Sequence, residues 1–115
     1  MDKGVRFEID YLQYVDADGV LQNPDLPEFA KDKSQLVALY QEMVKVRAFD
    51  TKAIALQRTG KLGTYASSLG HEASHIGIGS GMHIDDVLAP SYREYGAQIV
   101  RGVKPREILL FWGGD

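Results

Sequence analysis

The chain has 115 residues, of which 44% are hydrophobic and 25% are charged, and its formal net charge is −3. This composition is typical of a small soluble domain, and its weak negative charge excludes a strong attraction to nucleic acid or to an anionic membrane. The absence of cysteine excludes disulfides and thiolate metal sites. The chain has no apolar run long enough for a membrane span, and Met1 to Gly4 have no signal or transit pattern, so we expect a cytoplasmic protein.

Residues 1–30 are predicted to form an extended N-terminal arm that contains a short hairpin. Alternating apolar residues on both sides of Asp18-Gly19 predict two short strands joined by a tight turn. The prolines of Asn23-Pro24-Asp25-Leu26-Pro27 indicate a linker. The second predicted domain is residues 31–115.

Residues 34–58 are predicted to form a long helix with one broad buried face. Its apolar positions recur at spacings of three and four, and Gly60 is placed to end it. The apolar face consists of Leu36, Leu39, Tyr40, Met43, Val46, Ala53, Ile54 and Gln57. Arg47 and Asp50 lie three residues apart, and we interpret them as a solvated surface pair of small energetic value.

The glycine-rich second half is predicted to begin with a loop at 61–70 and a helix at 71–82. Gly77, Gly79 and Gly81 each weaken that helix by about 1 kcal/mol relative to alanine, and they permit close approach of another backbone or of a ligand. Asp85-Asp86 is predicted to be a turn.

The remaining segments are a short strand and two helices. Val87-Leu88-Ala89 is predicted to be a buried strand, stopped by a proline. A helix is expected over Tyr92–Arg101, with Ser91 as its cap and Gly102 as its stop. Pro105 suits the first position of a final helix.

The letters of His71-Glu72-Ala73-Ser74-His75 match the zinc-protease pattern, and Glu94 is a possible third ligand. Two histidines four residues apart on a helix reach one Zn²⁺ ion, and the intervening glutamate acts as a general base. A helix softened by glycines holds such ligands poorly, and the five-letter match is weak alone. A zinc metallohydrolase is therefore the less favoured alternative.

Ser91-Tyr92-Arg93-Glu94 forms a second constellation at a predicted helix start. Unpaired N–H groups, a guanidinium and a tyrosine hydroxyl together suit phosphate groups. The alternative is an ordinary helix start with an exposed Arg93 and a packed Tyr92.

Four runs of residues, in order and at specific spacing, make the chain resemble a known enzyme family. That family is the α subunit of the thiamine-diphosphate-dependent 2-oxo acid dehydrogenases, the decarboxylating first components of the pyruvate and branched-chain 2-oxo acid dehydrogenase complexes. The runs are Tyr40-Gln41-Glu42-Met43-Val44 with Arg47-Ala48-Phe49-Asp50, then Leu56 to Tyr65, then Gly70-His71-Glu72-Ala73, and Pro90-Ser91-Tyr92-Arg93-Glu94 with Arg101-Gly102.

The resemblance implies roles for residues in two of these runs. Ser91, Tyr92 and Arg93 would contact the diphosphate of the cofactor. Tyr65, Ser67 and Ser68 would lie near the substrate end of the site. His71 stands where the family usually has glutamine, which makes the zinc pattern a coincidence.

The resemblance also implies the chemistry, the partners and the fold. Thiamine diphosphate, held with Mg²⁺, would support decarboxylation of a 2-oxo acid and acyl transfer to lipoyl groups. The partners would be a β subunit, in an α2β2 assembly, and a lipoyl acyltransferase. The parent fold is the α/β thiamine-diphosphate-binding fold, of which this segment would be mostly α-helical with a short N-terminal hairpin and one or two short strands.

One departure concerns the magnesium motif. The family's Gly-Asp-Gly motif is absent, because Gly113-Gly114-Asp115 has another order, so the Mg²⁺ ligands are expected beyond residue 115. We therefore expect an incomplete α subunit that alone neither binds the cofactor tightly nor turns over a 2-oxo acid. A non-catalytic subunit-interaction module is the remaining alternative.

Overall fold

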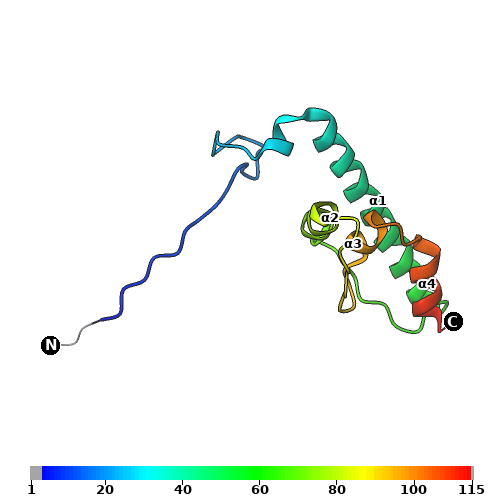
Figure 1. Cartoon of the computed structure of the whole chain (residues 1–115). Coiled ribbons are helices and arrows are strands. Elements are labelled where there is room, and N and C mark those ends of the chain that lie inside the picture. Colours follow the sequence, from blue (N-terminus) through cyan, green and yellow to red (C-terminus); the bar gives the residue numbers. More distant parts are fainter. Residues whose placement is uncertain (1–3, 115) are drawn as a thin grey trace. The chain divides into compact units, whose positions relative to one another are not determined.

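A computed structural model describes residues 4–114, which divide between Lys33 and Ser34 into two compact units. The helices are η1 (Glu28–Lys31), α1 (Lys33–Arg58), α2 (Glu72–Gly81), α3 (Tyr95–Val100) and α4 (Pro105–Gly113) (Figure 1). Within the described range, none of them is long and apolar enough to cross a membrane. The first three residues, for which no signal or transit pattern was predicted, and Asp115 lie outside the described residues.

The N-terminal unit contains the predicted turn but not the predicted strands. The Asp16 carboxylate accepts the N–H groups of Asp18 and Val20 at 3.0 and 2.8 Å, and Gly19 has a positive φ of 80°. Among the described residues of this unit, pairing is limited to one antiparallel bridge between Val15 and Leu21. The predicted hairpin is therefore wrong beyond its turn, since an isolated two-stranded hairpin is only marginally stable in water.

The predicted long helix is confirmed as α1, and its end is a Schellman motif. Gly60, at a φ of 78°, donates its N–H to the Gln57 carbonyl at 3.0 Å, and Lys61 donates to Leu56 at 2.9 Å. The buried face is limited to the second half of the helix, where Val46, Phe49, Asp50 and Ala53 are buried. In the first half, the large apolar side chains at positions 36, 37, 40 and 44 are exposed.

The predicted helix at 71–82 is confirmed as α2, and it packs against α3 (Figure 1). Gly79 allows this close approach, because a Cβ atom there would lie 2.9 Å from the Ala97 Cα and still closer to the Val100 side chain. Gly96 on α3 is similarly close to α2, since a Cβ there would lie 3.0 Å from the His75 Cβ. The close approach expected of this glycine-rich helix is thus made within the chain itself.

Two predictions between α2 and α3 are wrong. Val87-Leu88-Ala89 is not a strand in the described part of the chain, and Val87 is 88% exposed, because no neighbouring strand is there to pair with it. The preceding loop is instead held by Arg101, whose guanidinium donates to the carbonyls of His83 and Asp86 at 3.1 and 2.5 Å. Helix α3 begins at Tyr95, three residues later than predicted, although its predicted stop at Gly102 is confirmed by a φ of 104°.

The core of the second unit is aromatic. Phe49 of α1, Tyr95 of α3 and Ile108 of α4 are buried together, with Tyr65 and Trp112 packed against them. Tyr65 stacks on Tyr95 with ring centroids 5.3 Å apart. Helix α4 begins at Pro105 as predicted. The N–H of Lys104, the residue before this helix, donates to the Glu107 carboxylate at 2.8 Å. The mostly helical fold class is confirmed, whereas the short strands are not found among residues 4–114.

Candidate functional site

The loop that follows α1 is hydrogen-bonded to a buried carboxylate. Asp50 is only 1% exposed, and it accepts the hydroxyl groups of Tyr65 and Ser67 at 2.7 Å each. It also accepts the Ser68 N–H at 2.8 Å. The prediction of a solvated Arg47–Asp50 surface pair is therefore wrong, since Asp50 instead orders the loop.

The same loop is held from the other side by the segment that precedes α3. Arg93 Nη1 donates to the Ser67 carbonyl at 2.9 Å, and the Tyr95 hydroxyl donates to the Ala66 carbonyl at 2.8 Å. The guanidinium carbon of Arg93 lies 4.8 Å from the centroid of the Tyr92 ring, in a cation–π contact. The two predicted groups of site residues are thus brought together through Ser67 and Arg93.

A carboxylate closes the turn between Ser91 and Glu94. Glu94 Oε2 accepts the N–H groups of Ser91 and Arg93 at 2.9 and 3.1 Å. Burial of the Glu94 carboxyl acts to raise its pKa, but the N–H groups of Glu94 itself, Arg93 and Ser91, together with the charge of His75, outweigh burial and lower the pKa below its usual value. Ser91 is therefore not the cap that was predicted; its N–H is a donor to the side chain of Glu94.

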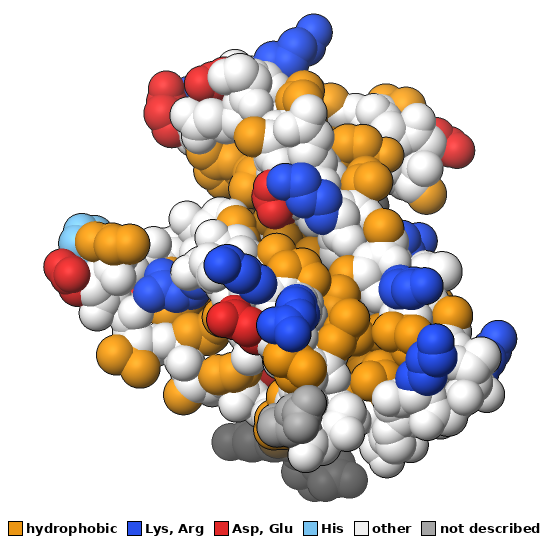
Figure 2. All heavy atoms as spheres, turned by 90° about the vertical axis from the view of Figure 1, so that its right-hand side faces the viewer, with side chains coloured by type: hydrophobic (Ala, Val, Ile, Leu, Met, Phe, Trp, Pro, Cys, Tyr) orange, Lys and Arg blue, Asp and Glu red, His pale blue; other side chains and the backbone are white. Residues whose placement is uncertain are grey.

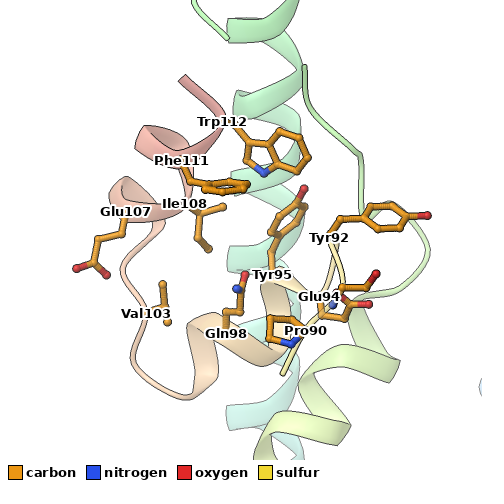
Figure 3. Close-up of a pocket in the computed structure, with 11 residues that line it drawn as sticks. Pro90, Tyr92, Glu94, Tyr95, Gln98, Val103, Glu107, Ile108, Phe111 and Trp112 are labelled. Atoms are coloured by element: carbon orange, nitrogen blue, oxygen red, sulfur yellow. The ribbon is translucent and has the colours of Figure 1, made fainter. Parts of the chain in front are cut away.

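A pocket of about 360 Å³ lies beside this turn and is bounded mainly by α3 and α4 (Figure 3). Figure 3 shows Ile108, Phe111 and Trp112 of α4 on one side and Tyr92 and Glu94 on the other. Its lining is Pro90, Ser91, Tyr92, Glu94, Tyr95, Gln98, Val103, Glu107, Ile108, Phe111 and Trp112. Ser91 and Tyr92 are part of this lining, but the Tyr92 ring points away from α4 in Figure 3, and its hydroxyl lies 3.4 Å from Arg93 Nη2. Arg93 is not part of the lining and donates to the Ser67 carbonyl.

The two tyrosines that hold the loop stay protonated. Burial raises the pKa of Tyr95 to about 12, the nearby Asp50 adding to the effect of burial. Burial and then the hydrogen bond to Asp50 raise the pKa of Tyr65 far above its ordinary value. Both hydroxyls are therefore hydrogen-bond donors at neutral pH, which matches the acceptors that they face.

The sequence interpretation missed an ion pair between Arg47 of α1 and Glu72 of α2. Their side chains form a hydrogen-bonded salt bridge in which the Glu72 side chain is buried and the Arg47 side chain is 55% exposed. The hydrogen bond from Arg47 lowers the pKa of Glu72, and the same bond raises the pKa of Arg47. The sequence gives no indication of this pair, because 25 residues separate its members.

The zinc interpretation finds no support among the described residues. Glu72 is engaged by Arg47, and Glu94 is engaged by backbone N–H groups. The rings of His71 and His75 lie 5.1 Å apart, but no group of three or more metal-ligating side chains occurs within residues 4–114. His75 is buried at the α2–α3 contact, where its Nδ1 has no hydrogen-bond partner among the described residues.

We expect the stability of the chain to fall as the pH drops below neutral, because of His75. Burial lowers the pKa of His75, and the charges of His71 and Arg93 act in the same direction, against Glu94 and Glu72. The unfolded chain takes up the proton near pH 6.5 and the folded chain only below that, so stability is lost as the pH falls from about 7 to 5.

Chemical denaturation at several pH values tests this expectation. His75→Leu should flatten the decline in unfolding free energy, whereas the same change at the exposed His83 should leave it unaltered. An equal pH dependence in the wild-type and His75→Leu chains would contradict the role given to His75.

Comparison with known proteins gives consistent matches. Residues 40–115 match the family described as "Dehydrogenase E1 component". The chain is 36% identical over 103 residues to the pyruvate dehydrogenase E1 component subunit alpha of Mycoplasma genitalium, covering 90% of this chain and 28% of that protein. It is 39% identical over 90 residues to the 3-methyl-2-oxobutanoate dehydrogenase subunit alpha of Mycobacterium tuberculosis, covering 78% of this chain and 23% of that protein.

A third relative matches almost the whole chain. The pyruvate dehydrogenase E1 component subunit alpha of Staphylococcus aureus is 35% identical over 113 residues, covering 98% of this chain and 30% of that protein. The chain thus spans less than a third of the length of these relatives. No solved structure matches the chain.

Proposed function

The chain belongs to the dehydrogenase E1 component family, and from this we propose that it forms the N-terminal part of the α subunit of a 2-oxo acid dehydrogenase. The observation that carries the proposal is the family match over residues 40–115, which includes the loop, the turn and the helices of the site. The proposed reaction is decarboxylation of a 2-oxo acid, pyruvate or a branched-chain acid, with acyl transfer to lipoyl groups. The names of the relatives support both substrates.

The donors present suit the diphosphate of thiamine diphosphate. Arg93 and Tyr92 lie together, with Arg93 Nη2 3.4 Å from the Tyr92 hydroxyl oxygen, and Ser91 is next to them in the chain. The Arg93 guanidinium forms no ion pair with a carboxylate among residues 4–114. Arginine and hydroxyl donors in this combination match phosphate oxygens. When bound, thiamine diphosphate supplies the nucleophilic carbon and the electron sink for decarboxylation.

The magnesium ligands are not found in the described part of the chain. Residues 4–114 contain no group of three or more carboxylates or histidines arranged to hold a metal ion. The donor set at Arg93 and Tyr92 has no metal-binding oxygen of its own beyond the hydroxyl group. Our proposal therefore assigns this segment to the diphosphate and leaves Mg²⁺ to other residues of the subunit.

The residues predicted to lie at the substrate end have a different proposed task. The hydroxyl groups of Tyr65 and Ser67 donate hydrogen bonds to Asp50, and the Ser68 hydroxyl lies 3.4 Å from the same carboxylate. We therefore propose that these residues fix the shape of the loop beside the substrate, because their hydroxyl groups are turned inward.

The proposed partners are a β subunit and a lipoyl acyltransferase, in a cytoplasmic complex. The exposed apolar residues of α1 support a protein partner, since large exposed apolar patches commonly mark interfaces. Figure 2 shows hydrophobic side chains at the surface, interspersed with Lys and Arg. The residues of α1 concerned are Leu36, Val37, Tyr40 and Val44.

Exchange of this segment into a relative tests the proposal. Residues 40–115 would replace the matching segment of the Staphylococcus aureus α subunit, and the chimera would be assembled with the β subunit of that organism. We expect decarboxylation of a 2-oxo acid that depends on thiamine diphosphate. Arg93→Ala should raise the cofactor KM about tenfold or more, because a hydrogen bond to a charged group is lost.

Arg106→Ala is the matched control, since Arg106 is exposed on α4 and lies outside the lining of the pocket. It should leave the cofactor KM unchanged. A folded chimera that assembles but shows no cofactor-dependent activity would count against the proposed function. Equal cofactor requirements in the parent and Arg93→Ala chimeras would remove the role given to Arg93.

A further inference from the structure

The loop at 65–68 is fixed from two sides, and Ser67 takes part in both attachments. Its hydroxyl donates to Asp50 Oδ2 at 2.7 Å, and its carbonyl accepts Arg93 Nη1 at 2.9 Å. The Ser67 Oγ also accepts the Leu69 N–H at 3.1 Å. The Ser67 residue therefore joins the buried carboxylate of α1 to the guanidinium of Arg93 through two hydrogen bonds, one at its hydroxyl and one at its carbonyl.

We propose that Asp50 is a positioning residue for the Arg93 guanidinium and acts through Ser67. The inference rests on the proposed function, in which Arg93 contacts the diphosphate of the cofactor. Asp50 is only 1% exposed, and its hydrogen bonds go to Tyr65, Ser67 and Ser68 and not to Arg93, so its effect on Arg93 is indirect.

The geometry around Arg93 shows why such positioning is needed. Nη1 of the guanidinium donates to the Ser67 carbonyl, Nη2 lies 3.4 Å from the Tyr92 hydroxyl oxygen, and the guanidinium carbon lies over the Tyr92 ring. A guanidinium has five N–H donors, so further donors are left for an anion. A long arginine side chain loses about 2 kcal/mol of rotamer entropy when it is fixed. If a protein contact already fixes the side chain, this loss no longer reduces the binding free energy of the anion.

The geometry around Asp50 shows why Asp50 can hold the Ser67 carbonyl, the partner of Arg93, in one position. Its two oxygens accept three donors from one loop, the side chains of Tyr65 and Ser67 and the backbone of Ser68. Because the carboxylate is buried on the rigid second half of α1, the loop has one favoured position. The Ser67 carbonyl is then held where Arg93 reaches it.

The first test follows the Arg93 side chain directly by NMR in the 115-residue chain. Asp50→Asn and Ser67→Ala each disturb the bond between Asp50 and Ser67 while keeping the Ser67 carbonyl. We expect both changes to shift the Arg93 Nε–H resonance and to speed its exchange with water. Ser74→Ala, at an exposed position on α2, is the matched control and should leave this resonance in place. An unchanged Arg93 resonance in both variants would overturn the proposal.

The second test is a double-mutant cycle read by NMR titration with thiamine diphosphate, which also detects weak binding. Ser67→Ala should weaken binding about threefold to tenfold in the wild-type background and add nothing in an Arg93→Ala background. A purely structural role of Ser67 would weaken binding equally in both backgrounds, and that result would refute positioning. If Arg93→Ala leaves binding unchanged, the proposed cofactor contact fails, while the Arg93 resonance still decides whether Asp50 positions the side chain.

Discussion

Replacing Asp50 with alanine is expected to lower the free energy of unfolding by about 3 to 5 kcal/mol. The reason is that the hydroxyls of Tyr65 and Ser67 and the N–H of Ser68 all donate to this buried carboxylate. Each buried donor left without an acceptor costs about 1 to 3 kcal/mol, and part of that is recovered where water enters. Because small domains have about 5 to 15 kcal/mol of stability in total, the loss is a large fraction of it.

Urea unfolding measures this loss, and Trp112 fluorescence reports on it locally. The Trp112 ring lies 5.9 Å from the ring of Tyr65, so release of the loop should alter its emission. Asp85→Ala is the matched control, since its side chain is 88% exposed, and its effect should stay within about 0.5 kcal/mol. Unfolding curves for Asp50→Ala and wild type that coincide would mean that the loop is not held by Asp50.

Helix positions in this chain are predictable from sequence, because they depend on local periodicity and end residues. The long helix, its glycine stop and the proline start of α4 are all found as predicted. The strand at 87–89 fails for the opposite reason, because a strand needs a partner that local sequence does not specify. The start of α3 moved because the Glu94 side chain takes up the N–H groups of Ser91 and Arg93, outside the helix.

The site was predictable only in part. Ser91, Tyr92 and Arg93 were selected from the predicted helix start and from the resemblance, and the first two line a pocket, whereas Arg93 does not. The role of Asp50 was missed, although its position offered an indication: it lies among the buried residues Val46, Phe49 and Ala53 of α1. A single carboxylate on a buried face becomes interpretable only when a distant loop supplies its donors, and the contact with Ser67 spans 17 residues.

Glycine substitutions in α2 provide the second large effect, because the same change at two nearby positions should have opposite signs. Gly79→Ala is expected to lower the free energy of unfolding by about 1 to 3 kcal/mol, as overpacking does. A Cβ at position 79 would lie 2.9 Å from the Ala97 Cα and 3.0 Å from the Ala97 carbonyl oxygen, and it would also overlap the Val100 side chain. Backbone atoms cannot turn aside, so α2 and α3 must separate.

Gly77→Ala is the matched control, two residues earlier in the same helix. A Cβ there meets nothing within 4 Å, so the gain in helix propensity, about 1 kcal/mol, should appear undiminished as increased stability. Thermal unfolding of both variants measures the difference. Adding Val100→Ala to Gly79→Ala should recover only part of the lost stability, because the new Cβ would still lie too close to the Ala97 backbone. If Gly79→Ala stabilised the chain as much as Gly77→Ala, the close contact between α2 and α3 would not exist in solution, and the burial of His75 at that contact would be in doubt with it.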